Sequence, residues 1–140
     1  MKKKMKVVIG GTFDIFHEGH AALFKKGFLL GEITVGLTSN KMAEKTRKRK
    51  VRDFRLRKKD LQSFFEKSSV KKYRILKIED KFGPTLEEDF DYIVVSPETH
   101  NNALLVNEKR RGLKKKPMKI VKIKFVLGKN GKPISATDIK

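Results

Sequence analysis

Cysteine is missing from this chain of 140 residues, and histidine occurs only three times. Without cysteine, disulfide bonds and thiolate metal sites are excluded, and a cytoplasmic location is the default expectation. No apolar run is long enough to span a bilayer. The basic start MKKKMKVVIGG has only about four apolar residues before its glycines, too few for a signal peptide. We therefore expect one domain over residues 1–140 and no membrane partner.

Acidic residues are also scarce, because 16 Asp and Glu stand against 35 Lys and Arg, a formal net charge of +19. Such an excess suits a nucleic-acid-binding surface, a lysine-rich surface of the kind found in heat-adapted proteins, or a site for a phosphate-rich small substrate. However, residues 45–59 are strongly basic and residues 79–91 are acidic, which favours local sites. The basic segments have few interleaved aromatics and no known nucleic-acid-binding signature, so nucleic acid is the less favoured partner.

Short apolar segments alternate with helical patterns along the chain. Strands are expected over residues 6–9, 32–37, 74–78, 92–95 and 118–127, and helices over residues 20–30, 52–66 and 98–111. Residues 82–90 contain Gly-Pro and an acidic cluster, which predicts a loop with a short helical piece. This alternation predicts an α/β fold, a single doubly wound domain with a parallel sheet of about five strands.

The segment GGTFDIFHEGH, residues 10–20, follows the first expected strand and holds two of the three histidines. In a doubly wound sheet, ligands bind at the carboxyl ends of the strands, where helix N-termini direct free N–H groups outward. His17 and His20 would lie on one helical face, and Gly19 would let a phosphate approach the backbone. The two imidazoles and the Thr12 hydroxyl could donate hydrogen bonds to phosphate and stabilise charge in a transition state.

Three other interpretations of this segment remain open on the residues alone. A zinc site would lack the H-E-x-x-H spacing, and only His100 and carboxylates could complete it. A dinucleotide-binding turn requires G-x-G-x-x-G, whereas the glycines here occupy positions 10, 11 and 19. Two solvated loop histidines are the third interpretation, and from spacing alone it is the commonest one for an arbitrary protein.

A resemblance decides among them. GTFDIFHEGH resembles the G-T-F-D-x-x-H-x-G-H signature of the HxGH nucleotidyltransferase superfamily, and ISATDI at 134–139 resembles its second signature, I-S-S/T-T-x-I/V. From about residue 6 to residue 140, the chain is similar to the archaeal and eukaryotic type of phosphopantetheine adenylyltransferase. The segments that carry this similarity are residues 35–45, 54–65, 78–99 and 107–117. Glycerol-phosphate cytidylyltransferases and FAD synthetases share the two signatures but not these segments.

The resemblance implies a Rossmann-like nucleotidyltransferase fold and adenylyl transfer from ATP to 4′-phosphopantetheine, with dephospho-coenzyme A and pyrophosphate as products. The acceptor phosphate would attack in line without a covalent intermediate, so positioning and charge neutralisation would carry the rate. The implied cofactor is Mg²⁺, bridging phosphate oxygens with few protein ligands. The alternatives are a sister nucleotidyltransferase with another nucleotide or acceptor, and a basic nucleic-acid-binding protein. Nothing in the sequence indicates the oligomeric state.

Site residues follow from the same resemblance. Thr12 and His20 are expected to hold the attacking phosphate and the α-phosphate, and His17 to reach the phosphates of ATP, so these three are the expected catalytic residues. Nucleotide contacts are implied for these three and for Gly11, Phe13, Ser96, Glu98, Thr99, Ser135 and Thr137. Contacts with the substrate phosphate are implied for Thr12 and Arg57, and one of Lys41 and Lys45 is expected to contact phosphate because both follow the second strand at its carboxyl end. No residue is expected to form a dedicated metal site.

Some of these residues also have simpler explanations. Residues 135–138, SATD, fit a helix capping box without any ligand. Arg110 and Arg111 match an N-E-x-R-R pattern of the family, but by themselves they would be ordinary compensation of a helix dipole. The family usually has Ser at position 136 and Arg at 138, where this chain has Ala and Asp. This change removes a cation from the expected triphosphate end, and nearby lysines could compensate for it.

Overall fold

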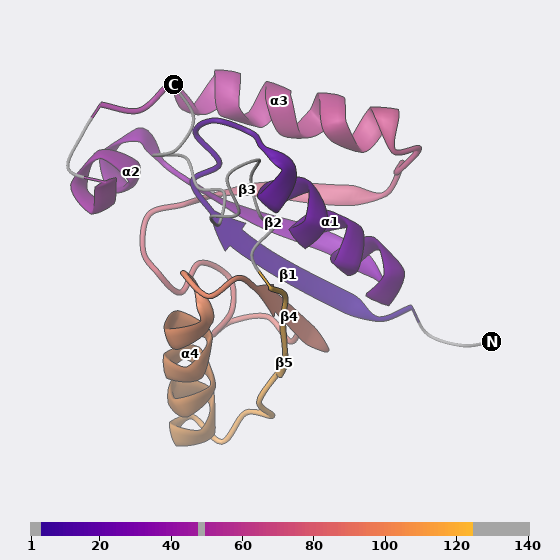
Figure 1. The fold of residues 1–140 in the computed structure, drawn as a ribbon. Coiled ribbons are helices and arrows are strands. Elements are labelled where there is room, and N and C mark those ends of the chain that lie inside the picture. The colour runs from indigo at the N-terminus through magenta and orange to yellow at the C-terminus, as the bar shows by residue number, and fades with distance from the viewer. Residues whose placement is uncertain (1–3, 48–49, 125–140) are drawn as a thin grey trace.

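The computed structural model describes residues 4–47 and 50–124 (Figure 1). Its five strands form one sheet in the order β3-β2-β1-β4-β5, and every neighbouring pair is parallel. The strands are β1 (Lys6–Gly11), β2 (Glu32–Thr38), β3 (Tyr73–Ile78), β4 (Tyr92–Val95) and β5 (Lys119–Lys122). The predicted α/β fold with a five-stranded parallel sheet is therefore confirmed.

Helices cover both faces of this sheet, as expected for a doubly wound fold. They are α1 (Glu18–Leu30), α2 (Asn40–Arg47), α3 (Phe54–Lys67) and α4 (His100–Gly112). Figure 1 shows α1 and α3 on one face and α4 on the other, with α2 at the edge where the strands end. No helix in the described part of the chain is long and apolar enough to cross a membrane.

The elements differ from the sequence-based expectations in several places. Helix α2 was not predicted; it begins after Ser39, whose hydroxyl accepts a hydrogen bond from the Met42 N–H at 3.1 Å. The expected short helical piece within 82–90 is a series of turns, in which the Glu88 N–H donates to the Pro84 carbonyl at 2.9 Å. Helix α4 begins at His100, and β5 ends at Lys122, inside the predicted range.

The face under α1 and α3 holds the larger part of the core. Alternate residues of β1 and β2 point to it, and phenylalanines of the two helices pack on them and on one another, with Phe24 and Phe65 in a T-shaped pair at 5.1 Å. The residues of this core are Val7, Ile9, Phe13, Leu23, Phe24, Ile33, Val35, Leu37, Leu61, Phe65 and Val94. This face is filled by large side chains.

The opposite face is packed only in part. A smaller core joins β1 and β4 to α4 through Val8, Ile93, Val95, Ala103 and Val106. Toward the carboxyl ends of the central strands, the same face carries Gly10 and Gly36, which are partners in the β1–β2 register. Gly10 and Gly36 carry no side chains, and α4 packs on β1 and β4 beside them. This part of the sheet face therefore leaves space for a ligand.

Candidate functional site

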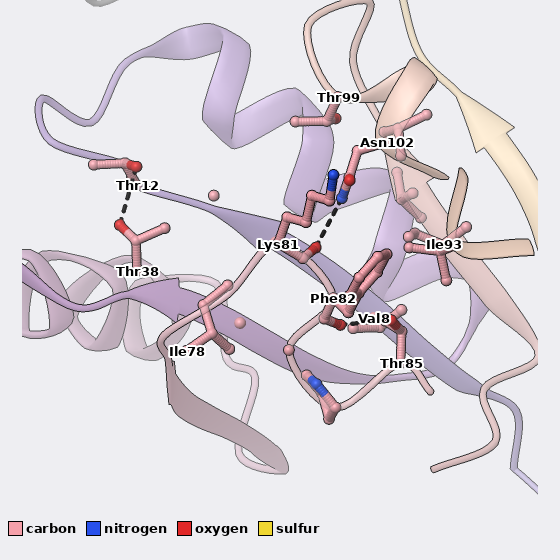
Figure 2. A pocket seen from close by; sticks show the side chains of 18 of the residues that line it. Val8, Thr12, Thr38, Ile78, Lys81, Phe82, Thr85, Ile93, Thr99 and Asn102 are labelled. Atoms are coloured by element: carbon pink, nitrogen blue, oxygen red, sulfur yellow. Dashed lines mark hydrogen bonds between the residues drawn. The ribbon is translucent and has the colours of Figure 1, made fainter. Parts of the chain in front are cut away.

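A cavity of about 470 Å³ lies at the carboxyl ends of β1, β2 and β4. The strand order reverses between β1 and β4, and open α/β sheets bind their ligands at such a point. The lining comes from these strand ends, from the turns that follow β3, and from the beginning of α4 (Figure 2). The topology therefore places the cavity where a substrate site is expected.

The floor of the cavity is bare backbone. A Cβ atom added to Gly10 would meet nothing closer than the Gly36 carbonyl oxygen, at 3.8 Å, so it would project into open space. A Cβ atom added to Gly36 would lie 3.3 Å from Cγ2 of Ile78, which is a tight contact. A ligand can therefore lie directly on the sheet at this pair of glycines.

The turns at residues 78–85 form one wall, which is mainly apolar through Ile78, Phe82 and Pro84. The Asn102 side chain of α4 donates to the Lys81 carbonyl at 2.9 Å and joins this wall to the helix (Figure 2). Among the residues that the structure describes, few polar ones line the cavity; they are Thr12, Thr38, Lys81, Thr85, Glu98, Thr99 and Asn102. An apolar lining with a few placed polar groups is typical of small-molecule sites.

Arg110 of α4 holds the same wall from outside the cavity. Its side chain is 1% exposed and donates to the carbonyls of Thr85 at 2.6 Å, Glu88 at 3.2 Å and Lys116 at 2.7 Å. It also pairs with the carboxylate of Asp89 and thereby holds the pKa of that group below its ordinary value. Arg110, the first arginine of the N-E-x-R-R stretch, therefore stabilises the backbone of the cavity wall.

The histidine turn lies between β1 and α1, and His17 is the N-cap of the helix. The Gly19 N–H donates to Nδ1 of His17 at 3.0 Å, and the His17 N–H donates to Nδ1 of His20 at 3.3 Å. Because both Nδ1 atoms accept, each neutral ring carries its proton on Nε2. The two rings stack with their centroids 3.7 Å apart. The cap of α1 thus fixes both imidazoles side by side, in the tautomer that donates through Nε2.

Phe13 fixes the turn from the core side. Its backbone has a φ of 47°, a left-handed conformation that costs a non-glycine residue about 1–2 kcal/mol. The buried ring offsets this cost by packing edge-on against His20 at 5.0 Å and against Phe24 at 5.0 Å. Phe16 contacts His20 as well, at 5.5 Å. The position of the His20 ring is therefore set by aromatic packing as well as by the helix cap.

Two arginines near the N-terminus of α3 hold the backbone of the turn. The Arg52 N–H donates to the buried carboxylate of Asp14 at 2.9 Å, and its Nε donates to the Asp14 carbonyl at 2.8 Å. Arg57 is fully buried and donates to the Thr12 carbonyl at 3.0 Å. Burial lowers the pKa of Arg57 from its ordinary value, and the nearby charge of Asp14 opposes this effect.

The structure distributes the predicted site residues over several places. Gly11, Thr12, Glu98 and Thr99 line the cavity. Phe13, His17 and His20 form the turn that follows Thr12. Ser96 begins the turn into α4, where its N–H donates to the Thr99 hydroxyl at 3.2 Å.

Apart from Thr12, the predicted phosphate-binding residues that the structure describes, Lys41, Lys45 and Arg57, lie outside the lining. Lys41 and Lys45 are exposed on α2. Met42 of the same helix lines the cavity. Arg57 lies behind Thr12 and uses its donors on protein oxygens. Ser135 and Thr137 lie outside the described residues. Each proposed contact with a ligand stays a prediction.

Sequence reasoning missed several residues that shape this site, above all Thr38, Gly36 and the wall at residues 78–85. Thr38 had a signal, because it ends the second strand in the place that Thr12 takes after the first. The wall had none beyond its Gly-Pro turn, since its place depends on contacts with Asn102 and Arg110, far along the chain.

Comparisons with known proteins agree with this architecture. A profile of the cytidylyltransferase-like family matches residues 8–140. The phosphopantetheine adenylyltransferase of Methanosarcina mazei is 42% identical over 139 residues, 96% of this chain and 89% of that protein. The enzyme of the same name from Archaeoglobus fulgidus is 43% identical over 138 residues, 97% of this chain and 93% of that protein.

Among solved structures, a protein from Archaeoglobus fulgidus described as having unknown function superposes with a TM-score of 0.80 at 42% identity, covering 85% of this chain and 89% of that one. The sequence relatives span nearly the whole chain, and their identity is well above the level at which only a fold is shared. The chain belongs to the phosphopantetheine adenylyltransferase family, within the broader cytidylyltransferase-like family.

Proposed function

We propose that the protein transfers the adenylyl group of ATP to 4′-phosphopantetheine, giving dephospho-coenzyme A and pyrophosphate. Relatives that are more than 40% identical bear the name of this activity. The structural observation that carries the proposal is the position of the histidine turn. It leaves β1 at the edge of the sheet where the strands end, and Gly11 and Thr12 of the same segment line the cavity.

The proposed chemistry requires positioned donors more than a base. An oxygen of the acceptor phosphate attacks the α-phosphorus of ATP in line, while the bond from that phosphorus to the bridging oxygen of pyrophosphate breaks. A phosphate is already a nucleophile, so the protein contributes orientation and stabilisation of the charge on phosphate oxygens. Nε2–H groups of His17 and His20 and the Thr12 hydroxyl are donors of the required kind, fixed before substrate arrives.

We assign the apolar wall of the cavity to the pantetheine arm of the acceptor. Phe82 and Pro84 offer apolar contacts, and the bare floor at Gly10 lets an extended chain lie on the sheet. Glu98 and Thr99, at the start of α4, keep the nucleotide contacts that the resemblance implies, as does Ser96. This division puts the reacting phosphates near Thr12, where the two parts of the site meet.

We propose that Mg²⁺ accompanies ATP, coordinated mainly by phosphate oxygens. In residues 4–47 and 50–124, no group of three or more His, Cys, Asp or Glu side chains could hold a metal ion by itself. The net charge of +19 also suits phosphate-rich substrates. Phosphate contacts of Lys41 or Lys45, and of Ser135 and Thr137, complete the proposal, together with a cytoplasmic location.

The test is pyrophosphate release from purified protein incubated with Mg²⁺, with ATP or CTP, and with each of several acceptors. The acceptors are 4′-phosphopantetheine, glycerol 3-phosphate and flavin mononucleotide. Release with ATP and 4′-phosphopantetheine only is the expected result. Release with another pair instead would reassign the protein to a sister activity. No release with any pair, together with tight and salt-sensitive RNA binding, would contradict the enzymatic proposal.

A further inference from the structure

Thr38, the last residue of β2, connects a buried cation to the hydroxyl at the end of the cavity. One terminal nitrogen of Arg57 lies 3.2 Å from the Thr38 hydroxyl oxygen, and that oxygen lies 3.0 Å from the hydroxyl oxygen of Thr12. Thr12 and Thr38 are both 5% exposed, and both line the cavity (Figure 2). The three side chains therefore form a continuous chain of hydrogen bonds that ends at the expected phosphate site.

The chemistry of the three groups gives this chain a direction. A guanidinium can only donate, so the Thr38 oxygen must accept from Arg57. An oxygen that accepts from a cation is a poorer acceptor for a second hydrogen, and its own O–H becomes a stronger donor. Thr38 therefore donates to Thr12, and the hydrogen of the Thr12 hydroxyl is directed away from Thr38.

We propose that Thr38 is a positioning residue for the transfer reaction: with Arg57 behind it, Thr38 orients the Thr12 hydroxyl so that its hydrogen is donated to a phosphate oxygen in the cavity. This inference rests on the proposed function and deepens it. Thr38 and Arg57 do not contact the substrate themselves in this proposal; they orient the Thr12 hydroxyl, which does.

The same guanidinium also holds the backbone of Thr12. A terminal nitrogen of Arg57 donates to the Thr12 carbonyl at 3.0 Å, and the other terminal nitrogen donates to the Asn40 side chain at 3.1 Å. The Nε atom donates to the Arg52 carbonyl at 2.8 Å. Both the main chain and the hydroxyl of Thr12 are thus fixed from one buried group. A donor that needs no reorganisation when charge develops is the kind that contributes most to catalysis.

The test compares three single variants with the wild-type protein. Thr38→Val keeps the size and the β-branch but removes the hydroxyl, and Thr38→Ser restores the hydroxyl. Asn40→Ala is a stringent control, because it removes a hydrogen bond from Arg57 that does not lead to Thr12, together with the hydrogen bonds of the Asn40 side chain to Asp53 and from the Phe54 N–H. We expect kcat/KM for 4′-phosphopantetheine to fall about tenfold in Thr38→Val, the scale of one hydrogen bond. It should stay within about threefold of wild type in Thr38→Ser and Asn40→Ala, by the same scale.

A double-mutant cycle with Thr12→Val separates positioning from direct contact. If Thr38 acts through Thr12, Thr38→Val costs nothing further once Thr12 has lost its hydroxyl. Wild-type activity in Thr38→Val would overturn the inference. So would a decrease in kcat/KM on Thr38→Val that is as large in the Thr12→Val background as in the wild-type protein. A loss in Asn40→Ala as large as that in Thr38→Val would overturn it as well, because it would show general damage around Arg57.

The dissociation constant of ATP, measured by calorimetry on the same proteins, keeps this test distinct from that of the proposed function. A wild-type protein that turns over no substrate pair would refute adenylyl transfer. The double-mutant cycle would then be measured as the dissociation constant of ATP. If Thr38→Val weakens ATP binding in the wild-type background but not in the Thr12→Val background, the inference is supported. Equal affinities of wild type and Thr38→Val for ATP, combined with equal turnover, would refute it.

Discussion

Two arginines, Arg57 and Arg110, are almost fully buried, with exposures of 0% and 1%, yet they serve different parts of the site. Arg57 holds the histidine turn, and its hydrogen bonds lead through Thr38 to the Thr12 hydroxyl. Arg110 holds the cavity wall through the carbonyls of Thr85 and Glu88. A buried cation thus supports the expected chemistry in one region and the shape of the cavity in the other.

The difference lies in what each guanidinium reaches. The acceptors of Arg57 are two carbonyls, a hydroxyl and an amide oxygen, all uncharged. Those of Arg110 include the carboxylate of Asp89, which extends into solvent with 85% of its side chain exposed. Loss of Arg57 should therefore affect turnover and stability together, whereas loss of Arg110 should act mainly on stability and substrate affinity.

The largest effect is expected at the end of the Arg57 region, in His20→Ala. Removing a fixed donor to the reacting phosphates should lower kcat by about 10²–10³-fold. The fold should persist, since the core under α1 remains, but the melting temperature should fall by a few degrees because the His17 N–H loses its acceptor and Phe13 loses a packing partner. His100→Ala is the control, because His100 is the first residue of α4 and has no proposed role in catalysis. Activity of His20→Ala near that of wild type would remove His20 from the mechanism.

Arg57→Met should follow, with loss of both stability and turnover. Methionine fills much of the space but donates nothing, so four oxygen atoms lose a donor, although the Asn40 oxygen keeps the Phe54 N–H and the Thr38 hydroxyl keeps its bond to Thr12. Unpaired buried polar groups cost about 1–3 kcal/mol each, partly relieved by water, and we expect about 3 kcal/mol in all. Urea unfolding and steady-state kinetics below the melting transition would measure the two losses. If Arg57→Met were as stable as wild type and turned over substrate normally, the claim that Arg57 supports both turnover and stability would be wrong.

Arg110→Met should be smaller in its effect on the reaction. We expect a loss of about 2 kcal/mol of unfolding free energy, because Glu88 is only partly buried and Asp89 is exposed, so that water can replace part of the lost hydrogen bonds. The wall at residues 78–85 should loosen, which raises KM for 4′-phosphopantetheine while kcat at saturation stays within about threefold, less than the effect of one hydrogen bond. A fall in kcat as deep as that of Arg57→Met would contradict the assignment of Arg110 to shape alone.

The smallest effect is expected in Asp89→Asn. The pKa of Asp89 is lowered from its ordinary value of 3.8, chiefly by its hydrogen bond with Arg110. The folded state therefore gains stability above that ordinary value and loses it as the pH falls through the lowered pKa. Asp89→Asn should slightly flatten the acid side of a plot of melting temperature against pH, most visibly at low salt. A large fall in melting temperature at neutral pH would contradict the expectation that this solvent-exposed ion pair contributes little to stability.

The sequence predicted the parts of the molecule that depend on local pattern. Apolar runs such as KVVI and EITVGL located the central strands, and the glycines after the first run located the histidine turn. Helix α2 was missed because NKMAEKTR is almost entirely polar and is held by the Ser39 cap. With two apolar residues in eight, the segment is too short and too polar for an apolar pattern to predict a helix.

The roles of the two arginines could not be predicted for a different reason. Helical spacing places Arg57 on the same face of α3 as Leu61 and Phe65, but an arginine at such a position is more often exposed, so the pattern does not predict its burial. Arg57 is buried because oxygens of Thr12, Thr38 and Asn40 converge on it from segments that only the folded sheet brings together. Arg110 likewise depends on the path of residues 85–89.

The most direct measurement is identification of the product formed from ATP and 4′-phosphopantetheine by the wild-type protein. We predict that mass spectrometry will detect dephospho-coenzyme A, in an amount equal to the pyrophosphate released, and that His20→Ala will form it far more slowly. Absence of dephospho-coenzyme A with the folded wild-type protein, or its formation at an equal rate by His20→Ala, would contradict the role assigned to the histidine turn.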